Sequence, residues 1–316
     1  MNMSKLTVSA NPHIKSTATT RGIMLDVILA LLPAGAASVV IFGVRSLFVI
    51  ITCVAVAVIS EYLSRRIMKR DCTIGDLSAV VTGLLLAYNL PATIPLWMAA
   101  IGSAVSIIVV KQMFGGIGHN FVNPALIGRI VLMNSFTKAM STWMLPMTYQ
   151  SGTSDVVTGA TPLALLKNGG EPASITDLFF GQTGGCLGET CALAILIGGV
   201  YLVVRRVISP VIPLFFVGTT ALLTFCAGYD PLYEVLSGGL LLGAVFMATD
   251  YATSPVTTKG KIIYAIGCGA ITAFIRIFGS LPEGVSYSII IMNIITPHID
   301  RLTRKKPFGA VKEAQE

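Results

Sequence analysis

Apolar stretches recur almost from end to end of this chain, and they constrain its fold more than any other feature of the sequence. A helix of roughly 20 apolar residues crosses the hydrocarbon core of a bilayer, and it satisfies its own backbone hydrogen bonds there. Only 12% of the residues are charged, against roughly 25% in soluble domains. The sequence therefore predicts an all-α integral membrane protein without a large soluble domain.

The apolar stretches divide into about ten predicted transmembrane helices. Their approximate bounds are 23–44, 46–63, 76–90, 93–110, 123–136, 188–204, 208–227, 236–250, 262–278 and 285–299. Several are short or contain Gly and Pro, which indicates interrupted helices.

Lysine and arginine indicate the orientation of these predicted helices. If the N-terminus is cytoplasmic, 17 of the 22 Lys and Arg residues fall in cytoplasmic segments, four fall on the other side and Arg129 lies within a span. Because cytoplasmic loops are enriched in Lys and Arg, both termini are predicted to be cytoplasmic. The net charge of +7 is then a consequence of topology, and no nucleic-acid partner is predicted. The first 22 residues lack the pattern of a cleaved signal peptide.

This topology divides the chain into five parts. They are a cytoplasmic segment (1–22), a first five-span repeat (23–136), an extracytoplasmic loop (137–187), a second five-span repeat (188–300) and a cytoplasmic tail (301–316). Because each repeat has an odd number of spans, the second runs in the opposite sense to the first. Residues 82–91 and 237–255 support the repeat, since both are Gly-led apolar runs broken by Asn or Asp and then Pro. Close helix packing is the alternative reason for these Gly and Pro residues.

The external loop contains Thr158, Gly159, Ala160 and Thr161, followed by Pro162. A threonine hydroxyl next to small residues is unhindered, and glycine lets the backbone approach a phosphate closely. A short helix starting after Thr161 would present its N-terminus to that phosphate. An ordinary turn in which Thr161 caps the helix explains the same residues. The motif by itself leaves both interpretations open.

Six segments resemble, in order and spacing, the D subunit of the Rnf complexes (RnfD), and they are also similar to the B subunit of the sodium-pumping NADH:quinone reductases (NqrB). These segments are 76–91, 111–129, 158–161, 184–190, 243–255 and 282–293. The resemblance runs from about residue 11 to residue 301. Only 22 residues precede the first span, whereas the quinone reductase proteins carry a longer extension, which favours the Rnf family.

The resemblance implies a membrane subunit of an ion-translocating ferredoxin:NAD oxidoreductase in a bacterial cell membrane, relaying electrons with the A, B, C, E and G subunits of that complex. It implies that a separate flavin transferase joins FMN through its phosphate to Thr161, within the motif formed with Thr158, Gly159 and Ala160. A urea-transporter-like fold of two inverted five-helix repeats is implied as well. No residue is predicted to be catalytic.

Two other functions fit the residues without the resemblance. One is a non-redox channel or solute carrier of similar fold, and the other is a scaffold protein of a complex in which Thr161 is unmodified. A plain channel has no use for a flavin acceptor, so the mass of the purified chain distinguishes these functions from a flavoprotein.

Ionisable residues also occur in or beside the predicted spans, namely Asp26, Asp76, Arg129, Glu189 and Asp250. A charge at the bilayer centre costs about 2.5–3.5 kcal/mol on insertion scales, so each is predicted to be paired or functional. Asp26, Asp76 and Glu189 lie near span ends, where solvation is the alternative.

A polar site inside the bundle is predicted from residues 120–129 and 249–254. Its candidate residues are Asn120, Asn123, Arg129, Thr249 and Asp250. The resemblance implies a second, non-covalent flavin such as riboflavin there. Arg129 and Asp250 are expected to pair with each other, to bind the cofactor or to steer a cation, and the sequence does not rank these roles.

The six cysteines show no C-x-x-C spacing, and the three histidines show no metal-site spacing. The sequence therefore predicts neither a metal site nor an iron–sulfur cluster bound by this chain alone. The sequence leaves open whether a cysteine of this chain binds a cluster together with a partner protein of a complex.

Overall fold

The computed structural model describes residues 19–147, 158–167, 169–170, 172–279 and 283–304. The first half of the chain begins with two long apolar helices and continues with shorter ones. They are α1 (Thr20–Phe42), α2 (Val44–Ile67), α3 (Ser78–Tyr88), α4 (Leu96–Val105), α5 (Pro124–Ser135) and α6 (Thr137–Met140). A 3-10 turn (Ile74–Asp76) precedes α3, and a π-helical segment (Ser106–Gln112) extends α4.

The second half mirrors this mixture of long and interrupted helices. They are α9 (Ala192–Val204), α10 (Val211–Cys226), α11 (Pro231–Leu236), α12 (Leu240–Leu242), α13 (Thr258–Phe278) and α14 (Val285–Thr303). A π-helical segment (Gly243–Met247) extends α12. Between the halves lie a two-stranded sheet of β1 (Trp143–Met144) and β2 (Thr158–Gly159), then α7 (Pro162–Lys167) and α8 (Ile175–Phe180).

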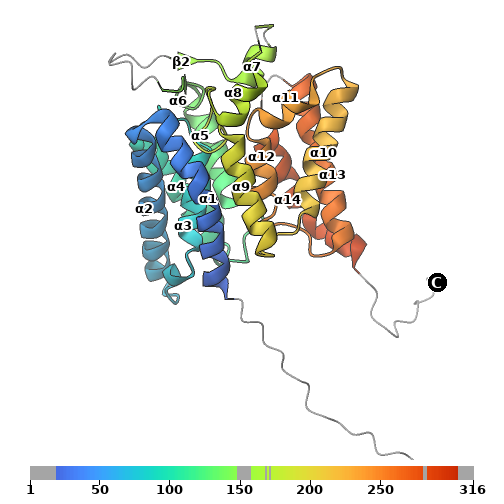
Figure 1. Cartoon of the computed structure of the whole chain (residues 1–316). Helices are drawn as coiled ribbons and strands as arrows, with labels where there is room; N and C mark the ends of the chain where they lie inside the picture. The colour runs from blue at the N-terminus through green and yellow to red at the C-terminus, as the bar shows by residue number, and fades with distance from the viewer. Residues whose placement is uncertain (1–18, 148–157, 168, 171, 280–282, 305–316) are drawn as a thin grey trace, which may run out of the picture.

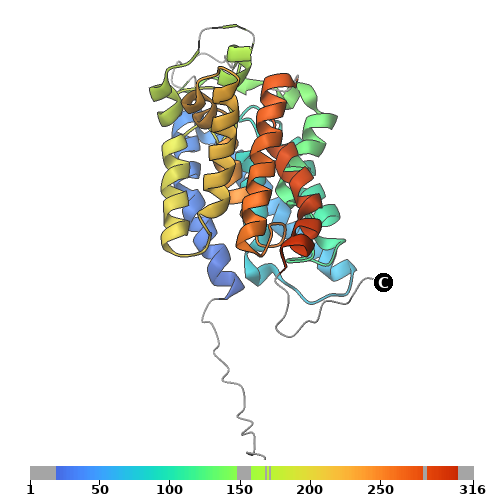
Figure 2. The same cartoon turned by 90° about the vertical axis from the view of Figure 1, so that its right-hand side faces the viewer.

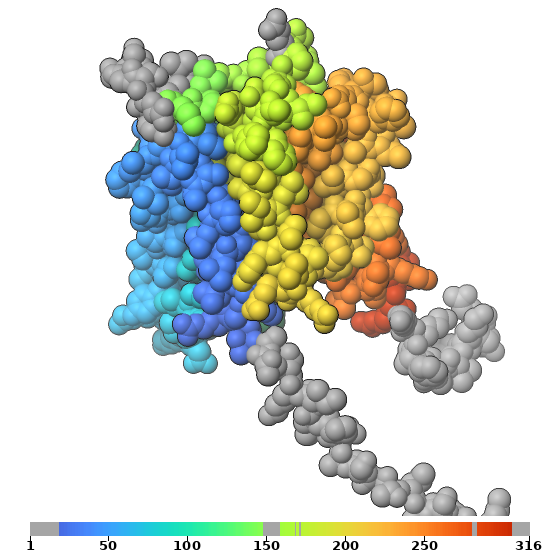
Figure 3. Space-filling model, viewed as in Figure 1, coloured from blue at the N-terminus to red at the C-terminus, as the bar shows by residue number. Residues whose placement is uncertain are grey.

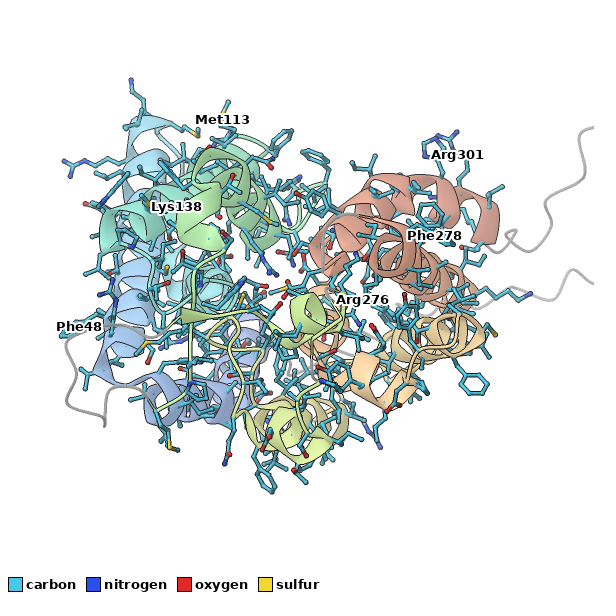
Figure 4. The ribbon with its side chains drawn as sticks, turned by 90° about the horizontal axis from the view of Figure 1, so that it is seen from above. Phe48, Met113, Lys138, Arg276, Phe278 and Arg301 are labelled. Carbon is cyan, nitrogen blue, oxygen red and sulfur yellow. The ribbon has the colours of Figure 1, made fainter. Side chains whose placement is uncertain are left out.

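The helices run side by side as one bundle (Figure 1). The start of α1 and the end of α14 lie at one end of the bundle, and β2, α7 and α8 lie at the other (Figures 1 and 2). Apolar side chains such as Phe48, which is 55% exposed, cover the rim, whereas Arg276 lies toward the middle (Figure 4). α1, α2 and α13 are long and apolar enough to cross a membrane. The predicted class of helical membrane protein is confirmed.

Glycines allow the helices of the bundle to approach closely. On the face shown in Figure 3, α1 and α9 lie side by side, and a Cβ at Gly198 would meet the carbonyl oxygen of Ala30. A Cβ at Gly83 of α3 would lie 2.8 Å from the Cα of Val54 in α2. Small residues at such contacts are typical of membrane helices, whose association depends on close packing.

Two predicted spans are shorter as helices than the sequence indicated. α3 has 11 residues, which rise about 16 Å at about 1.5 Å per residue, only half of a bilayer core of about 30 Å. The helix ends because Pro91 disfavours helical backbone at Leu90. The amides of Leu187 and Gly188 donate to the carbonyls of Leu90 (3.0 Å) and Tyr88 (2.9 Å), respectively. The loop before α9 therefore supplies hydrogen bonds to backbone carbonyls that are left free where α3 ends.

The corresponding interruption in the second half follows α12. Predicted span 236–250 is helical only from Leu240 to Met247, including its π-helical part. It begins after Gly238, whose φ of +67° suits glycine, and it ends at a turn around Asp250. Interrupted backbone at membrane depth is tolerated where protein buries it, and these two ends face the interior.

Candidate functional site

The TGAT loop is positioned by the small sheet and by α7. Thr158 pairs with Met144 and Gly159 with Trp143 in the antiparallel register. Gly159 fits closely, since a Cβ there would lie 2.7 Å from the side chain of Leu145. Ala160 is exposed and Thr161 then opens α7. The structure thus brings the four motif residues to the end of the bundle opposite the start of α1 (Figure 1).

Thr161 itself is 4% exposed, and its Oγ1 accepts a hydrogen bond from the amide of Ala164 at 3.3 Å. The capping role considered for this residue is therefore present in the unmodified chain. α7 is tied to the second half, because Tyr233 Oη donates to the carbonyl of Pro162 (3.2 Å) and Lys167 Nζ donates to that of Gly279 (2.5 Å). Oγ1 is thus engaged as the cap of α7.

A second site is a cavity of about 100 Å³ toward the other end of the bundle, open to solvent at its mouth. The structure brings four of the candidate residues, Asn120, Asn123, Thr249 and Asp250, together around it. Other polar lining groups are Ser78, Thr82 and Lys111. The apolar lining includes Ile23, Met24, Val27, Leu85, Ile208 and Phe246.

The polar wall of this cavity is built from the broken helix ends. Asn123 caps α5 by accepting from the amide of Ala125 (3.0 Å), and its Nδ2 donates to the carbonyl of Met247 (3.3 Å). Asp250 accepts from Thr253 Oγ1 at 3.2 Å within the turn that follows. The cavity therefore lies where residues near 120 meet residues near 250, next to the apolar faces of α1 and α3.

Arg129 does not belong to this cavity, and its pairing with Asp250 was a wrong alternative. Its Nη2 lies 2.5 Å from Glu283 Oε2, and its Nη1 donates to Asn89 Oδ1 (2.9 Å) and Ser286 Oγ (3.1 Å). Arg129 lies in the second turn of α5, where it contacts α14 and the end of α3. Asp250 lies in the turn that follows the π-helical segment. The two groups therefore serve different sites.

The other ionisable groups have local partners. Asp26 at the edge of α1 accepts from Tyr201 (3.0 Å) and lies 3.3 Å from Arg205. Asp76 accepts from the amide (2.8 Å) and hydroxyl (2.6 Å) of Ser78 at the start of α3. Pairing, rather than solvation alone, therefore accounts for both residues.

Several buried charges were missed from the sequence. Glu61 lies inside α2 and pairs with Lys111 at 2.8 Å, and Glu234 pairs with Arg276 at 2.8 Å. Glu283, the partner of Arg129, precedes α14 and lies outside every predicted span. A glutamate within the apolar run of span 46–63 was the available signal for Glu61. The other pairs join segments too distant in sequence to be matched by pattern.

Comparison with known proteins places these sites in a family. The model of the NQR2, RnfD, RnfE family matches residues 7–309. The chain belongs to this family. Similarity along the whole chain to proteins of Rnf complexes confirms the resemblance found in the sequence.

The chain is 49% identical to the D subunit of the Na(+)-translocating ferredoxin:NAD(+) oxidoreductase complex of Acetobacterium woodii, over all of this chain and 99% of the relative. It is 43% identical to the D subunit of the proton-translocating ferredoxin:NAD(+) oxidoreductase complex of Clostridium ljungdahlii, over 96% of each chain. It is 39% identical to the D subunit of the ion-translocating oxidoreductase complex of Stutzerimonas stutzeri, over 91% of each chain. The family match over residues 7–309 spans the segments that carry the TGAT loop and the cavity.

In this family member, the Arg129 pair is expected to be essential for stability. R129L leaves the carboxylate of Glu283, whose side chain is only 12% exposed, without its partner. Removing one half of a buried ion pair costs roughly 3–5 kcal/mol, and this pair lies close to that limit. A large fall in the melting temperature of the detergent-solubilised chain is therefore expected, measured by thermal unfolding.

The matched control is R205L, because the Arg205 side chain is 58% exposed in its ion pair with Asp26. Surface pairs contribute little, so R205L should leave the melting temperature nearly unchanged. The double variant R129L/E283Q should recover part of the loss. Equal losses in R129L and R205L would contradict a structural role for the buried pair.

Proposed function

We propose that this chain is the D subunit of a bacterial ion-translocating ferredoxin:NAD oxidoreductase and that it relays electrons through bound flavin. The full-length similarity to relatives with that name carries the proposal. The complex would supply the other Rnf proteins (A, B, C, E and G) as partners, with lipid against the apolar rim of the bundle. One of these relatives is named as Na(+)-translocating and the other as proton-translocating. The proposal therefore does not specify which ion is coupled to electron transfer.

In this proposal a separate flavin transferase joins FMN to Thr161 from a flavin dinucleotide. Oγ1 attacks the phosphorus that carries the FMN part, the phosphoanhydride bond of the donor breaks, and the nucleoside monophosphate leaves as Oγ1 loses its proton. The motif of Thr158, Gly159, Ala160 and Thr161 supports the assignment, as does its position at an end of the bundle. The hydroxyl is buried in the unmodified chain, so α7 has to move away from Tyr233 while the bond forms. FMN would supply one- and two-electron redox chemistry at that end, and Thr161 would hold it there.

T161V is expected to abolish in-gel flavin fluorescence of this chain when the transferase is co-expressed, because the isosteric side chain lacks the acceptor oxygen. T176V, at an exposed threonine of α8, is the control and should keep full fluorescence. Loss of the cap costs only about 1 kcal/mol, so T161V should still fold. Undiminished fluorescence in T161V would refute Thr161 as the acceptor.

We further propose ten spans in two inverted repeats, in the manner of urea transporters, with both termini cytoplasmic. The helix order supports this, because α3 and α12 lie in the third predicted span of their half and both end in interrupted backbone. The charge asymmetry of the loops supports the orientation. The loop that carries Thr161 is then extracytoplasmic.

Two native cysteines test this topology. Cys72 follows α2 and Cys226 ends α10, and both are exposed. In chains that keep one cysteine each, a membrane-impermeant thiol reagent should label Cys226 in intact spheroplasts and spare Cys72 until the membrane is permeabilised. The reverse pattern would invert the proposed orientation.

The cavity is proposed to hold a second, non-covalent flavin such as riboflavin. Its apolar wall suits a flat ring system, and Asn120, Asn123, Thr249 and Asp250 offer donors and acceptors to a polyhydroxyl chain. One flavin at the outer end would leave a bilayer core of about 30 Å to cross, so a centre deeper in the bundle shortens the electron path. A flavin bound here would supply that intermediate redox centre.

Filling the cavity tests this assignment. V27W places an indole in the cavity from α1 and should remove most acid-extractable flavin while leaving covalent flavin in place. V40W on the same helix, where Val40 is 59% exposed, is the control and should keep both. Extractable flavin at the wild-type ratio in V27W would place the second flavin elsewhere.

A further inference from the structure

A third polar group of residues lies where the loop before α9 meets α5, α11 and the start of α14. We call it the Glu189 cluster, and its charged members are Arg129, Glu189, Glu234, Arg276 and Glu283. Arg129 pairs with Glu283 at 2.5 Å and Arg276 pairs with Glu234 at 2.8 Å. Glu189, 4% exposed, is the carboxylate left over when these pairs are formed.

The charges of the Glu189 cluster do not balance among the described residues. Three carboxylates face two guanidinium groups, so the ionised cluster carries one net negative charge in the interior of the bundle. An isolated buried charge is costly unless it is paired or coordinates a metal. The cluster is therefore balanced either by one bound cation or by one proton on a carboxyl group.

The carboxylate of Glu189 is held open on one side. Its Oε1 accepts from the amide of Cys186 at 3.0 Å, whereas Oε2 has no hydrogen-bond partner among the described residues. Two glycines pack closely against this carboxylate, since a Cβ at Gly239 would lie 3.0 Å from Oε2 and one at Gly185 would lie 3.2 Å from Oε1. Oε2 is thus a buried carboxyl oxygen with a free acceptor site in the described part of the chain.

Further oxygen atoms surround the small pocket beside this carboxylate. Its lining includes Glu189, Glu283, Thr161, Thr183 and Thr190. Thr190 is 6% exposed, and its hydroxyl is also without a partner in the described part of the chain. The pocket has room for about one water-sized particle, which excludes an organic ligand.

The chemistry of these donors favours a hard metal cation. Carboxylate and hydroxyl oxygens are ligands for hard cations, whereas transition metals favour imidazole and thiolate. Nowhere in the described ranges do three or more His, Cys, Asp or Glu side chains converge as they would for a multivalent metal. A net charge of minus one is balanced by one monovalent ion.

We propose that Glu189 and Glu283, together with the hydroxyl of Thr190, form a binding site for one monovalent metal cation such as Na+. This site is separate from the cavity near Asp250 and goes beyond the proposed flavin function. It needs no flavin, although Thr161 lines the same pocket. A phosphoester on Thr161, which rests on the proposed function, would add negative charge and strengthen cation binding.

The test uses the full chain, expressed without a flavin transferase and purified in detergent, so its result does not depend on flavin attachment. NaCl is titrated at constant ionic strength against choline chloride while the melting temperature is followed. Saturable stabilisation by Na+ is expected for the wild type. E189Q should raise the apparent Kd for Na+ at least tenfold, and it should still fold because it removes an unpaired buried charge.

D230N is the matched control, because Asp230 is an exposed carboxylate at the start of α11 and asparagine preserves its cap. It should titrate like the wild type. Absence of a saturable Na+ effect, or an unchanged effect in E189Q, would overturn the proposal. A melting temperature that responds to pH but not to Na+ would also overturn it, since a proton would then balance the cluster.

Discussion

Arg129 and its partners join the interrupted helices of this protein. The guanidinium group contacts the residue that ends α3, the glutamate that precedes α14 and a serine in the first turn of α14. In a bilayer, backbone and side-chain polar groups have to be satisfied by the protein itself, because lipid offers them nothing. A single buried cation with several acceptors therefore fixes the relative positions of elements that would otherwise be free to slide.

The interruptions that need this support also create the sites. If α3 and the segment around α12 were full-length apolar helices, their side chains would pack together and leave neither cavity nor polar ends. Because they end halfway, Asn123 meets the carbonyl of Met247, and the turn at Asp250 lies beside the apolar faces of α1 and α3. The TGAT loop lies at the opposite end of the bundle (Figure 1). The loop and the cavity therefore lie on opposite sides of the fold.

Prediction from the sequence succeeded where the determining signal is local. Helices form within every predicted span, because a run of apolar residues in a bilayer has few alternatives to a helix. The helix after Thr161 begins at Pro162 as expected, since proline suits a first helical position. The lengths of α3 and α12 were overestimated, because hydropathy measures apolar character but not where backbone hydrogen bonding stops. Glu61 was overlooked for a related reason, as one charge hardly changes the average of a long apolar run.

The sequence by itself determined the membrane class, the charge asymmetry of the loops, the TGAT motif and the two polar interruptions near residues 120 and 250. Only the tertiary structure decided that Asn120, Asn123, Thr249 and Asp250 share a cavity and that Arg129 pairs with Glu283 instead of Asp250. It also left Glu189 without a lysine or arginine partner among the described residues. Composition and periodicity are properties of neighbouring residues, whereas Arg129 and Glu283 are separated by 154 positions. Which charges meet across such a separation depends on how the helices are oriented and packed, and no local pattern encodes that.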